Sequence, residues 1–387
     1  MRLRIGINAR LLTAPTLRGW NRYAVNLLAS LTDRDMDLIL YSDSEIHPDH
    51  LARLDGDHVT IRISPTMRYT QWEQFWLPRQ CVRDGVDILH SPLNFGLPWM
   101  CRCPRVLTLH DAIDQLYYGP KKSLRDQWSP RQVINRLRHW SSRQYADAII
   151  TVSEHAKTDL IHGLGLPPSK IRVIAEAADP SFLEPIPDHE RLKLRQTFDL
   201  KLPYIFYVGG WEQRKNIPFL LRAFARAQLH DTELVMAGGR DDQRSHLMSL
   251  AEELGIGGQL RLLGWVQESD LRALYAEALG FCYPSEYEGF GLQLCEAMAV
   301  GCPVLAARAT CLPEVLGSGG EMFTLDEPGE LAGLLRRLAS DSLYRQELSE
   351  KAQRRSVDFS WARAADQTVE VYRSLISEAA CELADRP

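Results

Sequence analysis

The chain of 387 residues is 45% hydrophobic and 25% charged, with a formal net charge of -5 at pH 7. This composition is typical of a folded protein long enough for two domains, and it excludes a disordered chain. The mildly negative charge argues against a nucleic-acid binder, so we expect small-molecule partners. No run approaches the roughly 18 apolar residues that a membrane-spanning helix needs. Eight scattered cysteines without paired CxxC spacing favour reduced thiols in a cytoplasmic protein.

The first half of the chain alternates short β-rich runs with amphipathic stretches. We expect helices over 20–31 and after Ser153, and strands over 3–7, 38–41, 88–90, 106–110 and 148–152. Such alternation predicts an α/β fold with a parallel sheet covered by helices. Ligands of these sheets bind at the carboxyl ends of the strands, so residues that directly follow strands are the candidate site residues.

A proline-rich, charged stretch from Asp179 to Pro203 interrupts this alternation. A second set of expected strands follows, beginning at Tyr204 and continuing with 234–237, 260–263 and 280–283. We therefore predict a first α/β domain over 1–185 and a second over 186–360. Residues 361–387 form a final helix and a tail.

Two glutamates flank a Gly-Phe-Gly turn in the stretch SEYEGFGLQLCEAMAVG, residues 285–301. Glu288 precedes the expected helix and Glu296 lies inside it, and the amides of a helix N-terminus attract anions. The unequal positions do not resemble two carboxylates that face each other across a sugar bond, as a glycoside hydrolase requires. The alternative interpretation is a solvated turn residue and a surface helix residue.

Three other places combine a strand end or a helix start with chemically suitable residues. Arg214 and Lys215, in YVGGWEQRKN, suit a diphosphate, although a solvated basic turn is the alternative. Gly19 precedes a helix and would let backbone approach a phosphate. His110 ends the strand in VLTLHDAID, where it either hydrogen-bonds a ligand or has only a structural role.

Taken together, these motifs resemble the retaining family 4 glycosyltransferases of the GT-B fold over nearly the whole chain. The E-x7-E element matches Glu288 to Glu296 with its internal GFGL, and the lysine-bearing loop matches GGWEQRKN. Four further elements agree in order: TLHD, TVSEHAKTDL, LLGWVQESDLRALYAEA and LPEVLG. The resemblance implies two Rossmann-like domains facing across a cleft, with the C-terminal helix crossing back to the first.

The resemblance also implies roles for the charged residues. Glu288 would bind hydroxyls of the donor sugar, and Glu296 would hold the ribose hydroxyls of the nucleotide. Arg214 and Lys215 would neutralise the diphosphate. Many relatives have Gly-Arg where this chain has Gly209–Gly210, and we expect Arg214 to compensate.

Further roles follow for less polar positions. The backbone amides of Phe290, Gly291 and Leu292 would meet the sugar and phosphates. Gly19 would contribute from the first domain, and Val266 would pack near the base.

His110 would touch the transferred sugar near the reacting carbon, which makes His110 and Glu288 the expected catalytic residues. Cations and helix amides aimed at the departing diphosphate supply the main stabilisation, so we expect no metal and no cofactor. The two Asp-x-Asp pairs, at 35–37 and 55–57, are interpreted as solvated loops. Anomeric configuration should be retained, with the departing phosphate helping to take the acceptor's proton.

The expected partners are a nucleotide sugar and a glycan or lipid-linked acceptor in cell-surface polysaccharide synthesis. The QRKN and LPEVLG variants look most like bacterial mannosyltransferases, which favours GDP-mannose. UDP-glucose or UDP-N-acetylglucosamine as the donor, and a catalytically silent nucleotide- or glycan-binding protein, remain alternatives.

Residues 117–145 carry seven Lys or Arg against one Asp. This segment would meet an anionic acceptor or the inner face of the membrane, or it is simply a solvated helix face.

Overall fold

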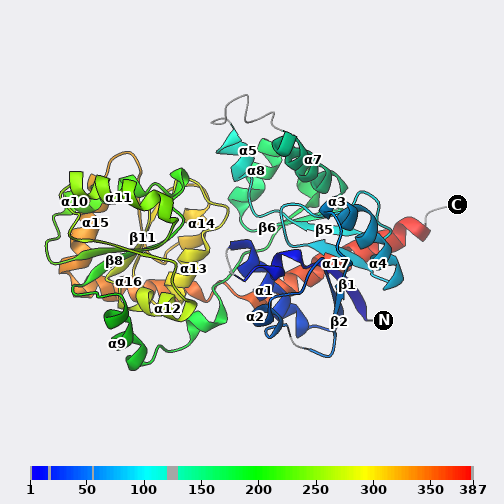
Figure 1. The fold of residues 1–387 in the computed structure, drawn as a ribbon, viewed down its shortest axis with the longest axis horizontal. Coiled ribbons are helices and arrows are strands. Elements are labelled where there is room, and N and C mark those ends of the chain that lie inside the picture. Colours follow the sequence, from blue (N-terminus) through cyan, green and yellow to red (C-terminus); the bar gives the residue numbers. More distant parts are fainter. Residues whose placement is uncertain (1, 16–18, 55, 120–129, 385–387) are drawn as a thin grey trace. The chain divides into compact units, whose positions relative to one another are not determined.

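The computed structural model describes residues 2–15, 19–54, 56–119 and 130–384. It divides into two compact units (Figure 1): residues 1–176 together with 360–387, and residues 177–359. Each unit is a parallel sheet with helices packed against it, which confirms the predicted α/β class of two Rossmann-like domains.

The first unit contains a seven-stranded sheet in the order β3-β2-β1-β4-β5-β6-β7. Ile5 and Ile7 of β1 and Leu89 of β4 have no exposed surface, because strands in a parallel sheet covered on both faces are apolar on both sides. The order reverses between β1 and β4, which makes their carboxyl ends the expected ligand position. The strands are β1 (Leu3–Asn8), β2 (Met36–Ser42), β3 (Val59–Ile63), β4 (Ile88–Ser91), β5 (Arg105–Thr108), β6 (Ala148–Thr151) and β7 (Ile171–Val173).

The helices of the first unit come from both ends of the chain. Helix α1 buries Tyr23, Leu27 and Leu31 on one face, and α17 (Trp361–Ala384) lies against it (Figure 1). The C-terminal helix therefore belongs to the first unit. The helices are α1 (Gly19–Thr32), α2 (Pro48–Leu51), α3 (Tyr69–Gln71), α4 (Leu77–Arg83), α5 (Ile113–Leu116), α7 (Pro130–Tyr145), α8 (Glu154–Leu164) and α17.

The second unit contains a six-stranded sheet in the order β10-β9-β8-β11-β12-β13. Its order reverses between β8 and β11, which are hydrogen-bonded neighbours. The strands are β8 (Tyr204–Gly209), β9 (Glu233–Gly238), β10 (Leu260–Gly264), β11 (Gly280–Tyr283), β12 (Val304–Ala307) and β13 (Glu321–Phe323). The helices are α9 (Asp188–Thr197), α10 (Ile217–Ala227), α11 (Asp241–Glu253), α12 (Glu268–Glu277), α13 (Leu292–Ala299), α14 (Leu312–Leu316), α15 (Gly329–Ser340) and α16 (Ser342–Ser356).

The proline-rich stretch after Asp179 packs within the second unit, although the sequence suggested a boundary inside it. The ring of Phe182 is buried against Tyr275, with 6.1 Å between centroids. Arg191 of α9 pairs with Glu277 at 2.9 Å. The units accordingly divide between Glu176 and Ala177, earlier than residue 185, and the second ends at Phe359.

Candidate functional site

The switch point of the second unit brings two loops together. A short 3-10 helix, Gln213–Lys215, follows β8, and the turn that holds Glu288 follows β11. Because β8 and β11 are parallel neighbours, both loops leave the same edge of the sheet. Lys215 Nζ lies 2.6 Å from Glu288 Oε1, and Arg214 Nη1 lies 2.6 Å from Glu288 Oε2. One carboxylate thus holds both cations.

Neighbouring groups fix this cluster in place. Lys215 Nζ also donates to the hydroxyl of Tyr283 at 2.7 Å, and that hydroxyl lies 3.1 Å from Glu288 Oε1. The backbone N–H of Glu288 donates to Thr310 Oγ1, from the loop after β12, at 3.1 Å. Three adjacent strand ends therefore position Glu288.

The cluster is buried, and its charges stabilise one another. Lys215 is 4% exposed and Glu288 is 6% exposed, which excludes the solvated-turn interpretation of both residues. Burial opposes ionisation of Glu288, but Lys215 and Arg214 outweigh it and hold its pKa at about 2. Burial lowers the pKa of Lys215, against the opposing effect of Glu288. Two cations and one carboxylate leave a net positive charge, as an anionic ligand requires.

Helix α13 begins directly after the Gly-Phe-Gly turn. Gly291 sits at its N-cap with φ +93, a conformation that favours glycine. The N–H groups of a first helical turn have no partner within the helix, so the turn through Phe290, Gly291 and Leu292 offers donors to an anion. Glu296, further along α13, is 2% exposed and accepts a hydrogen bond from Tyr275 at 3.1 Å. The alternative of a surface helix residue is therefore wrong for Glu296.

In the first unit, His110 follows β5 and is enclosed by polar and aromatic groups. Its Nδ1 lies 3.2 Å from Glu176 Oε1, and its backbone N–H donates to Asn94 Oδ1 at 2.8 Å. The ring of Tyr23 meets it edge-on at 4.6 Å between centroids, and the ring of Trp20 stacks on it at 5.9 Å. His110 is 3% exposed. These contacts fix the orientation of its ring.

A buried polar chain connects the C-terminal helix to this region. Tyr372 of α17 bonds His90 Nδ1 at 2.7 Å, and His90 Nε2 bonds Thr108 Oγ1 at 2.8 Å. The hydroxyl of Tyr23 lies 3.2 Å from the same Thr108 oxygen. Burial, reinforced by His110, lowers the pKa of His90 to about 3, so His90 is neutral and can accept as well as donate.

Two further predicted site residues are Gly19, at a helix start, and Val266, in a loop. Gly19 directly precedes Trp20, whose ring stacks on His110. Gly19 begins α1 with φ +26, and a Cβ built there meets no described atom within 4 Å. Val266 is half-buried in the loop after β10, an edge strand that β9 separates from β8. The predicted phosphate and base contacts of these two residues stay predictions.

The predicted basic segment and one acidic pair reach beyond the described residues. Within 117–145, residues 120–129 lie outside them, as does Asp55 of the second Asp-x-Asp pair. Asp37 lies inside β2 rather than in a loop, and Arg2 contacts both Asp35 and Asp37. That loop prediction was wrong for Asp37.

Sequence reasoning missed Glu176, Tyr283 and Thr310. Tyr283 is the last residue of β11, and Glu176 comes three residues after β7. The rule that site residues follow strands could have found both. Thr310 follows β12, a strand that we did not predict, so no comparable signal pointed to it.

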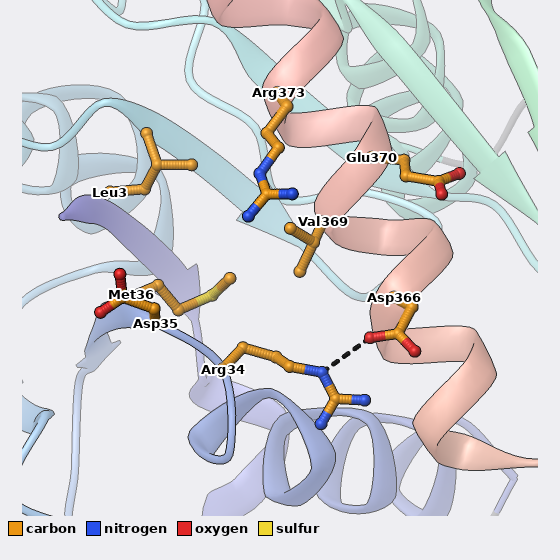
Figure 2. A pocket seen from close by; sticks show the side chains of 8 residues that line it. All are labelled: Leu3, Arg34, Asp35, Met36, Asp366, Val369, Glu370 and Arg373. Carbon is orange, nitrogen blue, oxygen red and sulfur yellow. Dashed lines mark hydrogen bonds and ion pairs between the residues drawn. The ribbon is translucent and has the colours of Figure 1, made fainter. Parts of the chain in front are cut away.

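A cavity of about 380 Å³ lies at the opposite end of the first sheet (Figure 2). Leu3 and Met36, the first residues of β1 and β2, line it together with α17, and Arg34 there pairs with Asp366 at 2.8 Å. The cavity lies at the amino ends of the strands, whereas His110 lies at their carboxyl ends.

Among the described residues, no helix is both long and apolar enough to cross a membrane.

The two Rossmann-like units, each with polar residues at the carboxyl edge of its sheet, define a GT-B architecture. Residues 17–182 match the model of Glycosyltransferase Family 4, and residues 188–355 match that of Glycosyl transferases group 1. The O-antigen chain mannosyltransferase B of Escherichia coli is 30% identical over 299 residues, 76% of each chain. The MMP α-(1→4)-mannosyltransferase of Mycolicibacterium hassiacum is 32% identical over 77% of this chain and 73% of its own. The chain belongs to glycosyltransferase family 4, as its motifs predicted.

Solved structures agree with the fold. WaaG, a glycosyltransferase involved in lipopolysaccharide biosynthesis, matches with a TM-score of 0.73 at 16% identity, over 96% of this chain and 99% of its own. Anabaena HepE in complex with UDP-glucose matches with a TM-score of 0.74 at 19% identity, over 96% and 100%. These likenesses support the GT-B fold of the chain.

Proposed function

We propose that this glycosyltransferase transfers mannose from GDP-mannose, with retention of configuration, to a glycan or lipid-linked acceptor in cell-surface polysaccharide synthesis. The observation that carries the proposal is the buried cluster of Arg214, Lys215 and Glu288 at the switch point of a family 4 chain. The names of the relatives, O-antigen chain mannosyltransferase B and MMP α-(1→4)-mannosyltransferase, favour mannose.

The chemistry requires stabilisation of a departing nucleoside diphosphate. The excess positive charge of the cluster and the first-turn amides of α13 supply it, so the reaction proceeds without a metal ion. Glu288 accepts hydrogen bonds from donor-sugar hydroxyls, and Glu296 from the ribose hydroxyls. His110, from the first unit, contacts the transferred sugar. Acceptor attack comes from the face that the diphosphate leaves, and a phosphate oxygen takes the proton.

A ligand screen tests the donor. We expect GDP and GDP-mannose to raise the thermal unfolding midpoint more than UDP, ADP and their sugars, because stabilisation by a bound ligand follows its affinity. A larger shift with UDP-glucose would favour the alternative donor, for which the UDP-glucose complex of HepE is a precedent. A chain that none of these ligands stabilises would favour the silent-protein alternative.

Slow hydrolysis of GDP-mannose in the absence of acceptor tests retention. Proton NMR should show α-mannose as the first product, before it equilibrates with the β-anomer. β-Mannose as the first product would contradict the retaining mechanism. Turnover should also persist in excess EDTA, and loss of activity that Mg²⁺ or Mn²⁺ restores would contradict metal independence.

The acceptor and the site of action are part of the same proposal. We place the enzyme in the cytoplasm, with residues 117–145 as a contact to the inner face of the membrane. Sedimentation with vesicles of anionic and of neutral lipid tests that contact. Anionic vesicles alone should pull the protein down, and an equal yield with both would contradict an electrostatic contact.

A further inference from the structure

Three thiols meet at one place in the first unit: a pair that is close in the sequence, and a third from a preceding helix. Cys81 lies in α4, whereas Cys101 and Cys103 lie in the loop between β4 and β5. The Sγ atoms of Cys101 and Cys103 are 3.3 Å apart, and all three Sγ atoms lie within 4.8 Å of one another. They are the three cysteines of this unit whose side chains the structure describes. The sequence indicated only the close pair.

We propose that Cys81, Cys101 and Cys103 form a binding site for a thiophilic metal ion, with Zn²⁺ as its occupant. Zinc–thiolate bonds are about 2.3 Å long, so three thiolates around one ion have sulfur–sulfur distances of about 3.8–4.0 Å. The distance between the sulfurs of Cys101 and Cys103, 3.3 Å, is somewhat shorter than this value, and no sulfur–sulfur distance in the trio exceeds 4.8 Å. Cys101 and Cys103 are half-buried, which leaves the fourth position of a tetrahedral ion open to water.

The backbone around the thiols is held in place without a metal. The carbonyl of Cys81 accepts from Val86 N–H at 2.9 Å. Trp99 N–H donates to Gln74 Oε1 at 2.8 Å, and Arg105 Nη1 donates to the carbonyl of Trp99 at 3.1 Å. Arg105 is itself fixed to Asp147 through its N–H at 2.8 Å. A site on an ordered frame needs little reorganisation to close on an ion.

The use of all three sulfurs favours a metal over a disulfide. A bond between Cys101 and Cys103 would leave Cys81, which is 2% exposed, as a third thiol without a role. An ion instead ties α4 to the β4–β5 loop, so it stabilises this part of the first unit. The four donors of a tetrahedral Zn²⁺ are then three protein sulfurs and one water. This site is separate from the sugar-transfer chemistry proposed above.

Titration of the reduced, metal-free full-length chain with Cd²⁺ under anaerobic conditions tests the proposal. Thiolate-to-cadmium charge transfer gives an ultraviolet band, which should saturate at one ion per chain. In a chain first loaded with Zn²⁺, each Cd²⁺ bound should release one Zn²⁺, because thiolates prefer the softer ion. Cys81→Ser and Cys103→Ser should each weaken binding at least about 100-fold, since loss of a mere supporting partner costs 10–100-fold. Zn²⁺ should raise the thermal unfolding midpoint of the parent chain but not of these variants.

A matched control and a competing outcome complete the experiment. Cys302→Ser removes a buried thiol from the second unit and should leave the band unchanged. A near-ultraviolet circular dichroism spectrum like that of the parent shows that each variant is folded. Absence of the band, or equal Cd²⁺ affinity in Cys81→Ser, would overturn the proposal. A disulfide in place of a metal site would also overturn the proposal. In that case the reduced chain binds no ion, and exposure to air lowers the mass of the peptide that contains Cys101 and Cys103 by two hydrogens.

Discussion

Glu288 pairs with both cations that were predicted to bind a diphosphate, Arg214 and Lys215, so the charges of the cluster balance in part within it. Its sequence position predicted a ligand contact, and its neighbours in space explain why it is ionised. The pairing itself was not predictable, because 73 residues separate Lys215 from Glu288 and only the adjacency of β8 and β11 joins them. The burial of Lys215 and Glu288 excludes the alternative that the sequence left open, in which both are solvated turn residues.

Lys215→Ala should weaken GDP binding about 10- to 100-fold, because it removes a charge-assisted phosphate contact. Arg214 still pairs with Glu288 in this variant, so the carboxylate is not left alone. Isothermal titration calorimetry measures the change. Lys201→Ala, with an exposed lysine of the same unit, is the control. Equal affinity in Lys215→Ala and the parent would contradict the assignment.

His110→Ala should leave GDP affinity within about twofold of the parent and lower kcat on the order of 100-fold, the effect typical of losing one transition-state contact. Initial rates of GDP release from GDP-mannose measure it. His162→Ala changes an exposed histidine of α8 and should retain full turnover. Loss of GDP binding in His110→Ala with unchanged kcat would reverse the proposed division of roles.

Ionisation of Glu288 should make the stability of the second unit depend on pH. Its pKa is lowered from 4.5 to about 2 in the folded chain, so its contribution is complete above about pH 4.5 and is lost as the pH falls through 2. The shift corresponds to on the order of 3 kcal/mol. Urea unfolding measures the free energy of unfolding of the parent and of Glu288→Gln. The difference between the two values should narrow steadily below pH 5.

Glu350→Gln, on the exposed side of α16, is the control for this experiment. Its unfolding free energy relative to the parent should change much less over the same range. A difference between the parent and Glu288→Gln that widens on acidification would mean that the carboxylate is not stabilised in the folded state.

Among the elements, most strands were predictable, including the four-residue strands β4, β5, β6 and β11 and the edge strand β10. β1, β2, β8 and β9 are apolar runs of six or seven residues. The missed strands include β13, with three residues, and β3, whose five residues are all half-buried or exposed. An edge strand with little burial carries a weak hydrophobic signal, which explains why β3 was missed. β12 was missed although its four residues are buried.

Tyr372→Phe should destabilise the first unit by about 1–3 kcal/mol, because it leaves His90 Nδ1 buried without its partner. Helix α17 thus stabilises the first unit through a specific bond as well as apolar packing. The midpoint of urea unfolding, followed by near-ultraviolet circular dichroism, measures the loss. Ser374→Ala, two residues further along the same helix, is the control. An unchanged midpoint in Tyr372→Phe would show that the bond to His90 contributes nothing.

At the scale of the whole molecule, the alternation of strands and helices in the sequence predicted the α/β class and the two sheets. It did not predict that the units divide between Glu176 and Ala177. Prolines and charges after Asp179 resemble a linker, yet Phe182 is 1% exposed within the second unit. Burial of a single aromatic ring against a distant helix leaves no local signature. The grouping of the C-terminal helix with the first domain likewise came from family resemblance, since no local pattern identifies its partner.

GDP should slow hydrogen exchange in the second unit more than in the first. Because Arg214, Lys215 and the start of α13 all belong to the second unit, slowed exchange should concentrate in peptides covering 209–216 and 286–296. Mass spectrometry of peptides from the free and GDP-bound chain measures it. Protection confined to peptides of the first unit would contradict the placement of the nucleotide.

The first unit is assembled from residues 1–176 and 360–387, whereas the second is continuous from 177 to 359. Domains commonly fold in the order in which the ribosome makes them. Here the first sheet emerges early, but its covering helix α17, with Trp361 and Tyr372, is translated only after the whole second unit. The second domain can therefore complete its fold while α1 still exposes the apolar surface that α17 will cover. The first domain is thus the first to begin its synthesis, but it can complete its fold only after the whole second domain has been made.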